Sequence, residues 1–223
     1  MSKLSELEIG DSVVVKAGTE DDDWDIDLSG WQGRITEILA DENIVTVEWD
    51  SISLQSMPDA AIEECEEEGL GWAEYRLYPE DVEPAQPRDT QKDVEQVQAE
   101  IAKKFAWSFL GPEGRNINKV LAGVGRGDIM AELGAWEEYL NEHLKFPFKA
   151  RVAEYQQRGP LQAGDRVQVL GIALIDDLYG LIVDVRVGRA KYAFPLADLE
   201  VLNKKSPSHD IVHDYCVWFA NRW

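Results

Sequence analysis

The sequence predicts an α+β protein: two small β-barrel units joined by a helical segment, with a helix at the C-terminal end. Three observations lead to this prediction. The same pattern of β-forming residues occurs in both halves, helical periodicity fills the middle, and all the excess charge lies in the first half. With 223 residues, 44% of them hydrophobic, the chain is long enough for one large domain or two small ones.

Charge divides the chain into two different parts. Residues 1–96 hold 27 acidic and six basic residues, whereas residues 97–223 hold 16 of each. The net charge of −21 therefore comes from the first part. Such a charge repels nucleic-acid phosphates and anionic lipids and attracts cations or basic proteins. We therefore expect no nucleic-acid or membrane partner.

The first unit is predicted to span residues 1–84 and to be rich in β-structure. Strands are expected over residues 12–15, after a Gly-Asp turn, and over residues 31–39 and 44–49 on either side of an acidic turn. A helical insertion follows at residues 60–68, where a run of helix formers ends at a glycine.

A polar linker with prolines is predicted over residues 85–96, and a second domain over residues 97–223. Helical periodicity predicts helices over residues 94–110, 117–133 and 135–145, the last one amphipathic and stopped by a proline. The second domain should therefore begin with helices.

The pattern of the first unit then returns. Residues 163–169 repeat the form of residues 9–15, and residues 194–200 parallel residues 77–83. Short strands joined by tight turns in both places predict a small SH3-like β-barrel in each half. A final amphipathic helix is expected to begin after Ser206, which can cap it.

Five stretches stand out between Trp136 and Trp223: WEEYLNEHLKFPFKA, GPLQAGDRVQVLGI, DDLYGLIV, AFPLADLEV and DYCVWFANR. With these stretches, the segment resembles the CcbP family of cyanobacterial calcium-binding proteins. It implies calcium binding, without an EF-hand, by a cytoplasmic protein that buffers calcium or signals. That family is acidic throughout, whereas the matching half here is neutral. The acidity lies in an added N-terminal unit whose stretches GWQGRITEI and VEWDSISL look like a separate SH3-like module.

Asp176 and Asp177 are the first candidate calcium ligands, because they form an acidic turn inside the stretch that resembles the family. Calcium takes about six to eight oxygen ligands, of which one turn can supply two or three. The alternative is a polar hairpin tip, where aspartate is favoured for its turn chemistry alone.

A second and weaker site is predicted among Asp22, Asp23, Asp25 and Asp27. Carboxylates this close repel one another, and a cation would relieve the repulsion. The stretch is not an EF-hand, because isoleucine and glutamine stand where the loop needs glycine and glutamate. The alternatives are a solvated loop or a face for a basic partner.

Tryptophans are frequent in the first unit, where Trp31 and Trp49 are expected in the core and Trp24 on the surface. SH3-like barrels often bind peptides through exposed aromatic residues. The rival hypothesis is therefore a metal-independent interaction protein whose acidic module recruits a basic partner.

No catalytic site is predicted. His209 and His213 have zinc-binding spacing, but Asp210 stands where a metalloprotease needs glutamate, and no third ligand is indicated. Cys65 and Cys216 are interpreted as core residues rather than a disulfide framework. No signal-peptide core or membrane-spanning run is present, so we expect a cytoplasmic protein.

Overall fold

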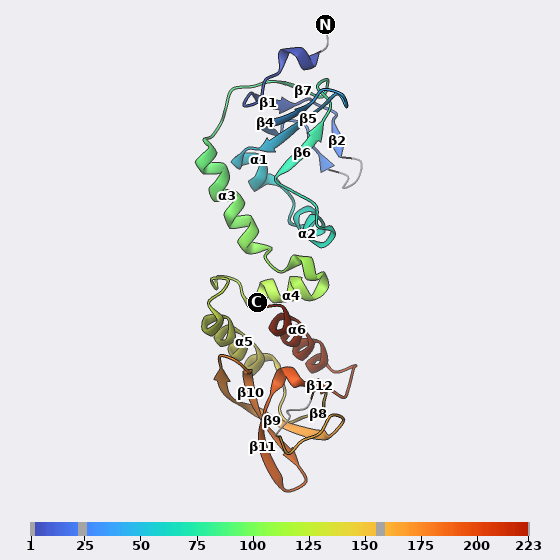
Figure 1. The fold of residues 1–223 in the computed structure, drawn as a ribbon, viewed down its shortest axis with the longest axis vertical. Coiled ribbons are helices and arrows are strands. Elements are labelled where there is room, and N and C mark those ends of the chain that lie inside the picture. The colour runs from blue at the N-terminus through green and yellow to red at the C-terminus, as the bar shows by residue number, and fades with distance from the viewer. Residues whose placement is uncertain (1–2, 22–25, 155–158, 223) are drawn as a thin grey trace. The chain divides into compact units, whose positions relative to one another are not determined.

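The computed structural model of the chain describes residues 3–21, 26–154 and 159–222. Contacts divide the chain into two compact units, Met1–Phe109 and Leu110–Trp223. Each unit contains a five-stranded antiparallel sheet accompanied by helices (Figure 1). The mixed α and β composition and the C-terminal helix are therefore as predicted. None of the helices in the described residues is long and apolar enough to span a membrane.

The first sheet has the strand order β6-β5-β4-β1-β7. The strands of this unit are β1 (Ser12–Val15), β2 (Glu20–Asp21), β3 (Ile26–Asp27), β4 (Gln32–Leu39), β5 (Ile44–Trp49), β6 (Glu74–Leu77) and β7 (Val82–Pro84). The short strands β2 and β3 form a separate antiparallel pair, in which Glu20 lies opposite Asp27. The three strands predicted at the start of the chain are confirmed.

Glycine is required at one point of this sheet. Gly33 on β4 pairs with Trp49 on β5, and a Cβ at Gly33 would collide with the backbone carbonyl of Glu48. The glycine in the stretch GWQGR thus allows the two strands to approach.

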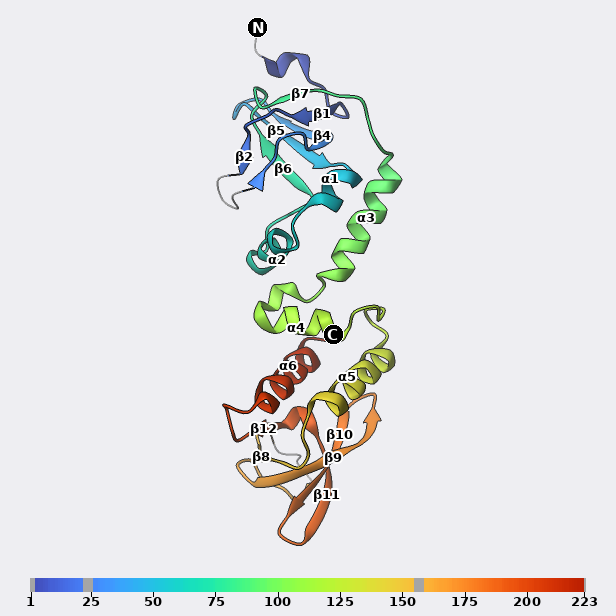
Figure 2. The same cartoon turned by 180° about the vertical axis from the view of Figure 1, so that it is seen from behind.

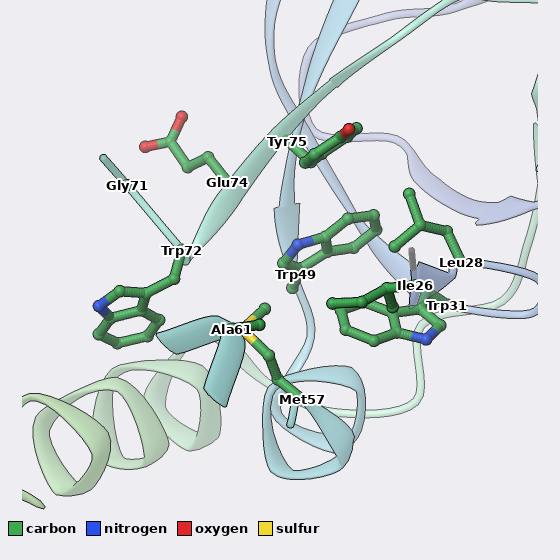
Figure 3. Close-up of a pocket in the computed structure, with 10 residues that line it drawn as sticks. All are labelled: Ile26, Leu28, Trp31, Trp49, Met57, Ala61, Gly71, Trp72, Glu74 and Tyr75. Carbon is green, nitrogen blue, oxygen red and sulfur yellow. The ribbon is translucent and has the colours of Figure 1, made fainter. Parts of the chain in front are cut away.

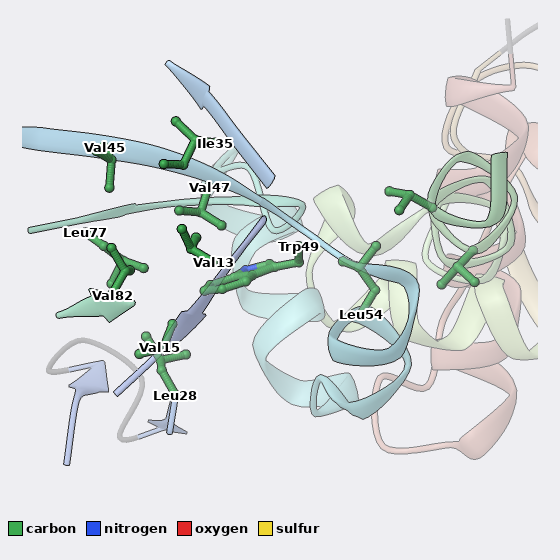
Figure 4. Close-up of a cluster of buried hydrophobic side chains, with 12 residues drawn as sticks. Val13, Val15, Leu28, Ile35, Val45, Val47, Trp49, Leu54, Leu77 and Val82 are labelled. Carbon is green, nitrogen blue, oxygen red and sulfur yellow. The ribbon is translucent and has the colours of Figure 1, made fainter. Parts of the chain in front are cut away.

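The first core contains the inward-facing residues of the sheet and also residues of helix α3 (Gln91–Lys104) (Figure 4). Val94 and Val97 of α3 are buried in this core, and α3 packs against helix α1 (Ser51–Ser56). Thr90 begins α3 with a capping box. The contacts thus assign α3 to the first unit. The linker predicted at residues 85–96 overlaps the start of this helix. Whether residues 1–84 fold independently stays a prediction.

The helical insertion is confirmed as α2 (Asp59–Glu68), which ends at Gly69 in the left-handed conformation. The single helix predicted over residues 117–133 is wrong. The structure has α4 (Pro112–Val120) and α5 (Ile129–His143) instead. Two of the glycines between them, Gly123 and Gly127, take positive φ angles, which a right-handed helix does not accept, and Asp128 caps a new helix.

The second sheet has the strand order β11-β10-β9-β8-β12. Its strands are β8 (Phe148–Val152), β9 (Arg166–Asp176), β10 (Gly180–Val187), β11 (Ala190–Pro195) and β12 (Leu199–Val201). Helix α5 contacts β9 and β10, and helix α6 (Pro207–Asn221) contacts β12, so both helices lie against this sheet (Figure 2). Ser206 caps α6 as predicted.

The repeated sequence pattern does not produce the same strand order twice. In the first unit β1 lies between β4 and β7, whereas in the second its counterpart β9 lies between β10 and β8. Strand β8 comes before the repeat in sequence and separates β9 from β12. In the described residues the edge strands of neither sheet pair with each other, so the predicted SH3-like barrels are not confirmed.

Candidate functional site

The turn at Asp176 and Asp177 joins β9 to β10 within the second unit. Asp176 ends β9 and pairs with Gly180, the first residue of β10. Its Oδ1 accepts hydrogen bonds from the backbone N–H groups of Leu178 (2.9 Å) and Tyr179 (2.8 Å). The side chain of Asp177 is exposed. The turn therefore fixes one carboxylate by its own backbone and leaves Oδ2 of Asp176 and all of Asp177 available.

Helix α6 holds the base of this turn. The backbone N–H of Leu181 donates a 2.8 Å hydrogen bond to the buried hydroxyl of Tyr215, whose pKa is raised by burial. Gly180 has a φ of 73°, and a Cβ there would collide with the hydroxyl of Tyr215 and the ring of Phe219. Glycine at this position is required both by its backbone angle and by the close approach of the helix.

A permanent cation also lies beside the turn. Arg222 Nη2 donates to the carbonyl oxygen of Leu178 at 3.3 Å, and its guanidinium lies 3.3 Å from the ring centroid of Phe219. Burial lowers the pKa of Arg222. A positive charge at this carbonyl opposes a second cation at the same oxygen, so any metal would have to bind on the carboxylate side of the turn.

The donors of the turn fit calcium in kind but supply only part of a shell. Carboxylate and carbonyl oxygens are the ligands that calcium prefers, and it needs about six to eight of them. Within the described ranges, no three acidic, histidine or cysteine side chains gather closely enough to hold a metal. Because Asp177 is exposed, water can reach the remaining coordination positions.

Of the four acidic residues predicted as a second site, Asp22, Asp23 and Asp25 lie outside the described residues. Asp27 is exposed on β3, and its Oδ1 accepts a 2.8 Å hydrogen bond from the backbone N–H of Ser29. Hydrogen bonds from the side chain and the backbone of Ser29 lower the pKa of Asp27. This carboxylate stays ionised and is already engaged in a local turn.

A buried carboxylate that was not predicted from the sequence lies between α4 and α6. Asp214 accepts a 2.9 Å hydrogen bond at Oδ2 from Nδ2 of Asn116, and burial raises its pKa. His213 Nε2 lies 3.5 Å from Glu113 Oε1, so its nearest acidic partner is on α4. An aspartate beside the apolar stripe of the C-terminal helix was the available signal in the sequence.

Aromatic side chains line a pocket in the first unit (Figure 3). Its volume is about 300 Å³, including the open mouth, and Glu74 is its one charged lining residue in the described part of the chain. Trp49 forms an edge contact with Trp31 (5.1 Å between ring centroids) and stacks on Tyr75 (6.1 Å). Trp49 is 1% exposed, which confirms it as a core residue, and Trp31 is partly buried against the same core.

Other residues singled out in the sequence have mixed outcomes. Cys65 is buried as predicted, and Cys216 is partly buried, with the pKa of its thiol raised to about 12 by burial. Trp24, expected on the surface, lies outside the described residues.

Comparisons with known proteins find a family match for the C-terminal part of the chain. Residues 128–219 match the family model Calci_bind_CcbP, described as calcium binding. The chain is similar to the crystal structure of CcbP from Anabaena. The alignment covers 47% of this chain and 89% of the CcbP chain, with 24% sequence identity and a TM-score of 0.39. A second similar structure is a calcium-binding protein in its calcium-binding form. That alignment covers 50% of this chain and 91% of the other chain, with 21% sequence identity and a TM-score of 0.41. No curated protein matches the chain.

The family match includes β8 to β12, the Asp176–Asp177 turn and most of α6. It leaves out the whole first unit. Over residues 128–219, therefore, the chain matches the CcbP-type calcium-binding family, as the stretches in its sequence predicted.

Proposed function

We propose that the C-terminal unit binds calcium, and that the protein acts in the cytoplasm as a calcium buffer or signalling component without catalysing a reaction. The observation that carries this proposal is the family match over residues 128–219. The function requires only reversible binding, so no catalytic group is needed.

Asp176 and Asp177 are the ligands we propose. Oδ1 of Asp176 is held by two backbone N–H groups, and Tyr215 fixes the start of β10. A carboxylate that is already oriented loses less side-chain entropy when it binds an ion. Calcium bound on the outer side of the turn would complete its shell with carbonyl oxygens and water.

Isothermal titration with calcium tests the proposal on the full chain. The double variant Asp176→Asn/Asp177→Asn should lose affinity by about tenfold or more, because calcium affinity follows the number of charged ligands. The variant Asp41→Asn/Glu42→Gln removes the same charge from an exposed turn in the first unit and should leave the affinity unchanged. Absence of calcium binding by the wild type at millimolar concentration would refute the function. Equal affinity in both double variants would show that Asp176 and Asp177 are not the calcium ligands.

A second and weaker calcium site is proposed at Asp22, Asp23, Asp25 and Asp27. Its support is the charge density of the sequence alone. The variant Asp22→Asn/Asp23→Asn/Asp25→Asn should remove one weak binding event from the isotherm and leave the stronger one in place. If the isotherm of this variant matches the wild type, the stretch holds no calcium.

The second candidate function is recruitment of a basic protein by the first unit. It is favoured by the pocket in Figure 3, whose rings lie in a unit that holds 28 acidic and eight basic residues. A peptide with an apolar side chain between arginines would match both features. Its binding should quench tryptophan fluorescence without calcium and weaken with salt. If Trp31→Ala and Trp72→Ala bind such a peptide as the wild type does, the pocket is not its site.

A further inference from the structure

The second unit carries a basic pocket on its sheet. Lys149, Arg166 and Arg186 line it, together with Gln168 and four mainly apolar or small residues, Val167, Val187, Gly188 and Leu202. The pocket has a volume of about 810 Å³, including its open mouth. Acidic residues outnumber basic ones 43 to 22 in this chain, yet the pocket has no acidic lining residue in the described ranges.

Strand register brings the cationic side chains together. Lys149 on β8 pairs with Gln168 on β9, Gln168 pairs with Arg186 on β10, and Arg186 pairs with Lys191 on β11. Directly paired residues project from the same face of a sheet, so these four side chains form one row across four strands. Three of the four are cations, and all three are exposed.

A second pairing adds to the positive charge. Arg151 on β8 lies opposite Arg166 on β9. Like charges directly opposite each other destabilise a sheet, and here this happens twice, at Arg151–Arg166 and at Arg186–Lys191. Sheet stability alone does not explain such an arrangement.

In the described part of the chain, an ion pair neutralises one of these cations. Arg151 forms a 2.5 Å ion pair with Glu200 on β12. Arg186 donates to the side-chain oxygen of Gln168, which carries no charge. Within the described residues, Lys149, Arg166, Arg186 and Lys191 have no carboxylate within ion-pair distance.

We propose that this pocket binds a small anion with two linked phosphoryl groups, such as the diphosphate part of a larger ligand. Neighbouring strands lie about 4.8 Å apart, so the strand positions of Lys149 and Arg186 flank Gln168 across roughly 10 Å. That span is wide for one phosphate and suits two. The planar guanidinium groups of Arg166 and Arg186 bind phosphoryl oxygens through paired N–H donors, and Lys149 supplies a compact charge.

Titration with pyrophosphate in calcium-free buffer tests this proposal on the full chain. Backbone amide resonances of Val167, Val187 and Gly188 should shift in a saturable way. The variants Lys149→Gln and Arg186→Gln should each weaken binding about tenfold, because each removes charged hydrogen bonds to the ligand. Lys145→Gln removes the same charge from an exposed position outside the pocket and should bind as the wild type does.

Three comparisons decide the chemistry of the ligand. Orthophosphate should bind more weakly than pyrophosphate, and citrate, an anion of similar charge without phosphorus, should bind more weakly still. If ADP binds more tightly than pyrophosphate, the diphosphate group belongs to a nucleoside diphosphate. If the two bind equally, the ligand is a free diphosphate.

The proposal is overturned if pyrophosphate at millimolar concentration shifts no resonance near the pocket. It is also overturned if citrate binds equally well, or if the pocket variants bind as the wild type does. The replaced residues are all exposed, and the folding of each variant is checked by unchanged resonances of the second unit away from the pocket. None of these measurements depends on calcium, and the proposal can fail or succeed independently of the calcium-binding function.

Discussion

Replacement of Tyr215 by phenylalanine should destabilise the second unit and loosen the candidate calcium turn. The hydroxyl of Tyr215 is the hydrogen-bond acceptor for the backbone N–H of Leu181, and both residues are 0% exposed. The ring remains in the variant, so apolar packing is retained. The buried N–H loses its acceptor, however, and an unsatisfied buried donor costs about 1–3 kcal/mol. For a unit of this size, each kcal/mol lowers the midpoint of thermal unfolding by about 4–8 °C.

Amide hydrogen exchange measured by NMR at Leu181 is the most direct assay, because it reports on this N–H alone. The variant should exchange faster at Leu181, and global unfolding of the second unit should occur at lower temperature. Tyr192→Phe is the matched control, since Tyr192 is a partly exposed residue on β11. If Tyr215→Phe and Tyr192→Phe have the same stability and the same exchange rate at Leu181, the hydrogen bond does not support the turn.

Three further changes test other parts of the structure. In the variant Asp214→Asn, the new side-chain amide oxygen can still accept the hydrogen bond from Asn116. Burial raises the pKa of the Asp214 carboxyl in the folded state, so the carboxyl of the unfolded chain ionises at lower pH. The stability of the wild type relative to the variant should therefore fall as the pH rises above the ordinary pKa of aspartate, as measured by denaturant titrations. Gly33→Ala should cost more than about 2 kcal/mol in the first unit, measured by urea unfolding, because its Cβ would meet the Glu48 carbonyl; an unchanged midpoint would contradict this. Thr90→Ala removes a helix cap and should cost about 1 kcal/mol in the same assay, whereas Thr90→Ser should cost little.

Local sequence chemistry predicted many of the elements. The strands around residues 12–15 and 44–49 followed from runs of β-forming residues beside turns, and α6 followed from a serine cap and an apolar stripe. These signals depend on a few neighbouring residues. They therefore predict the element correctly without knowledge of its tertiary contacts.

The strand order of the second sheet depends on partners far apart in the chain, and the sequence did not predict it. The repeat suggests that β12 should lie beside β9, as β7 lies beside β1. Strand β8 takes that place: Ala150 pairs with Val167 on β9, Val152 pairs with Leu199 on β12, and both side chains are buried. Burial of an additional strand overrides the symmetry of the repeat.

The same limit applies to the division between the units. The stretch 85–96 looks like a linker, but Val94 within it and Val97 just after it complete the core of the first unit. Composition alone cannot show which core an amphipathic helix will cover. The role of Arg222 at the candidate turn is likewise invisible in sequence, because it depends on α6 ending beside the β9–β10 hairpin.

The two sites proposed for the second unit lie at opposite ends of one hairpin. Asp176 ends β9, and Gln168 in the basic row is eight residues earlier on the same strand. At about 3.4 Å per residue, these positions are roughly 25 Å apart. Interactions between exposed charges are largely screened beyond about 8–10 Å at physiological salt. The carboxylates at one end therefore do not neutralise the cations at the other, although the unit as a whole is nearly neutral. If both proposals hold, each end of the hairpin binds its own counter-ion from solution, a cation on the carboxylate side of the turn and an anion at the basic pocket.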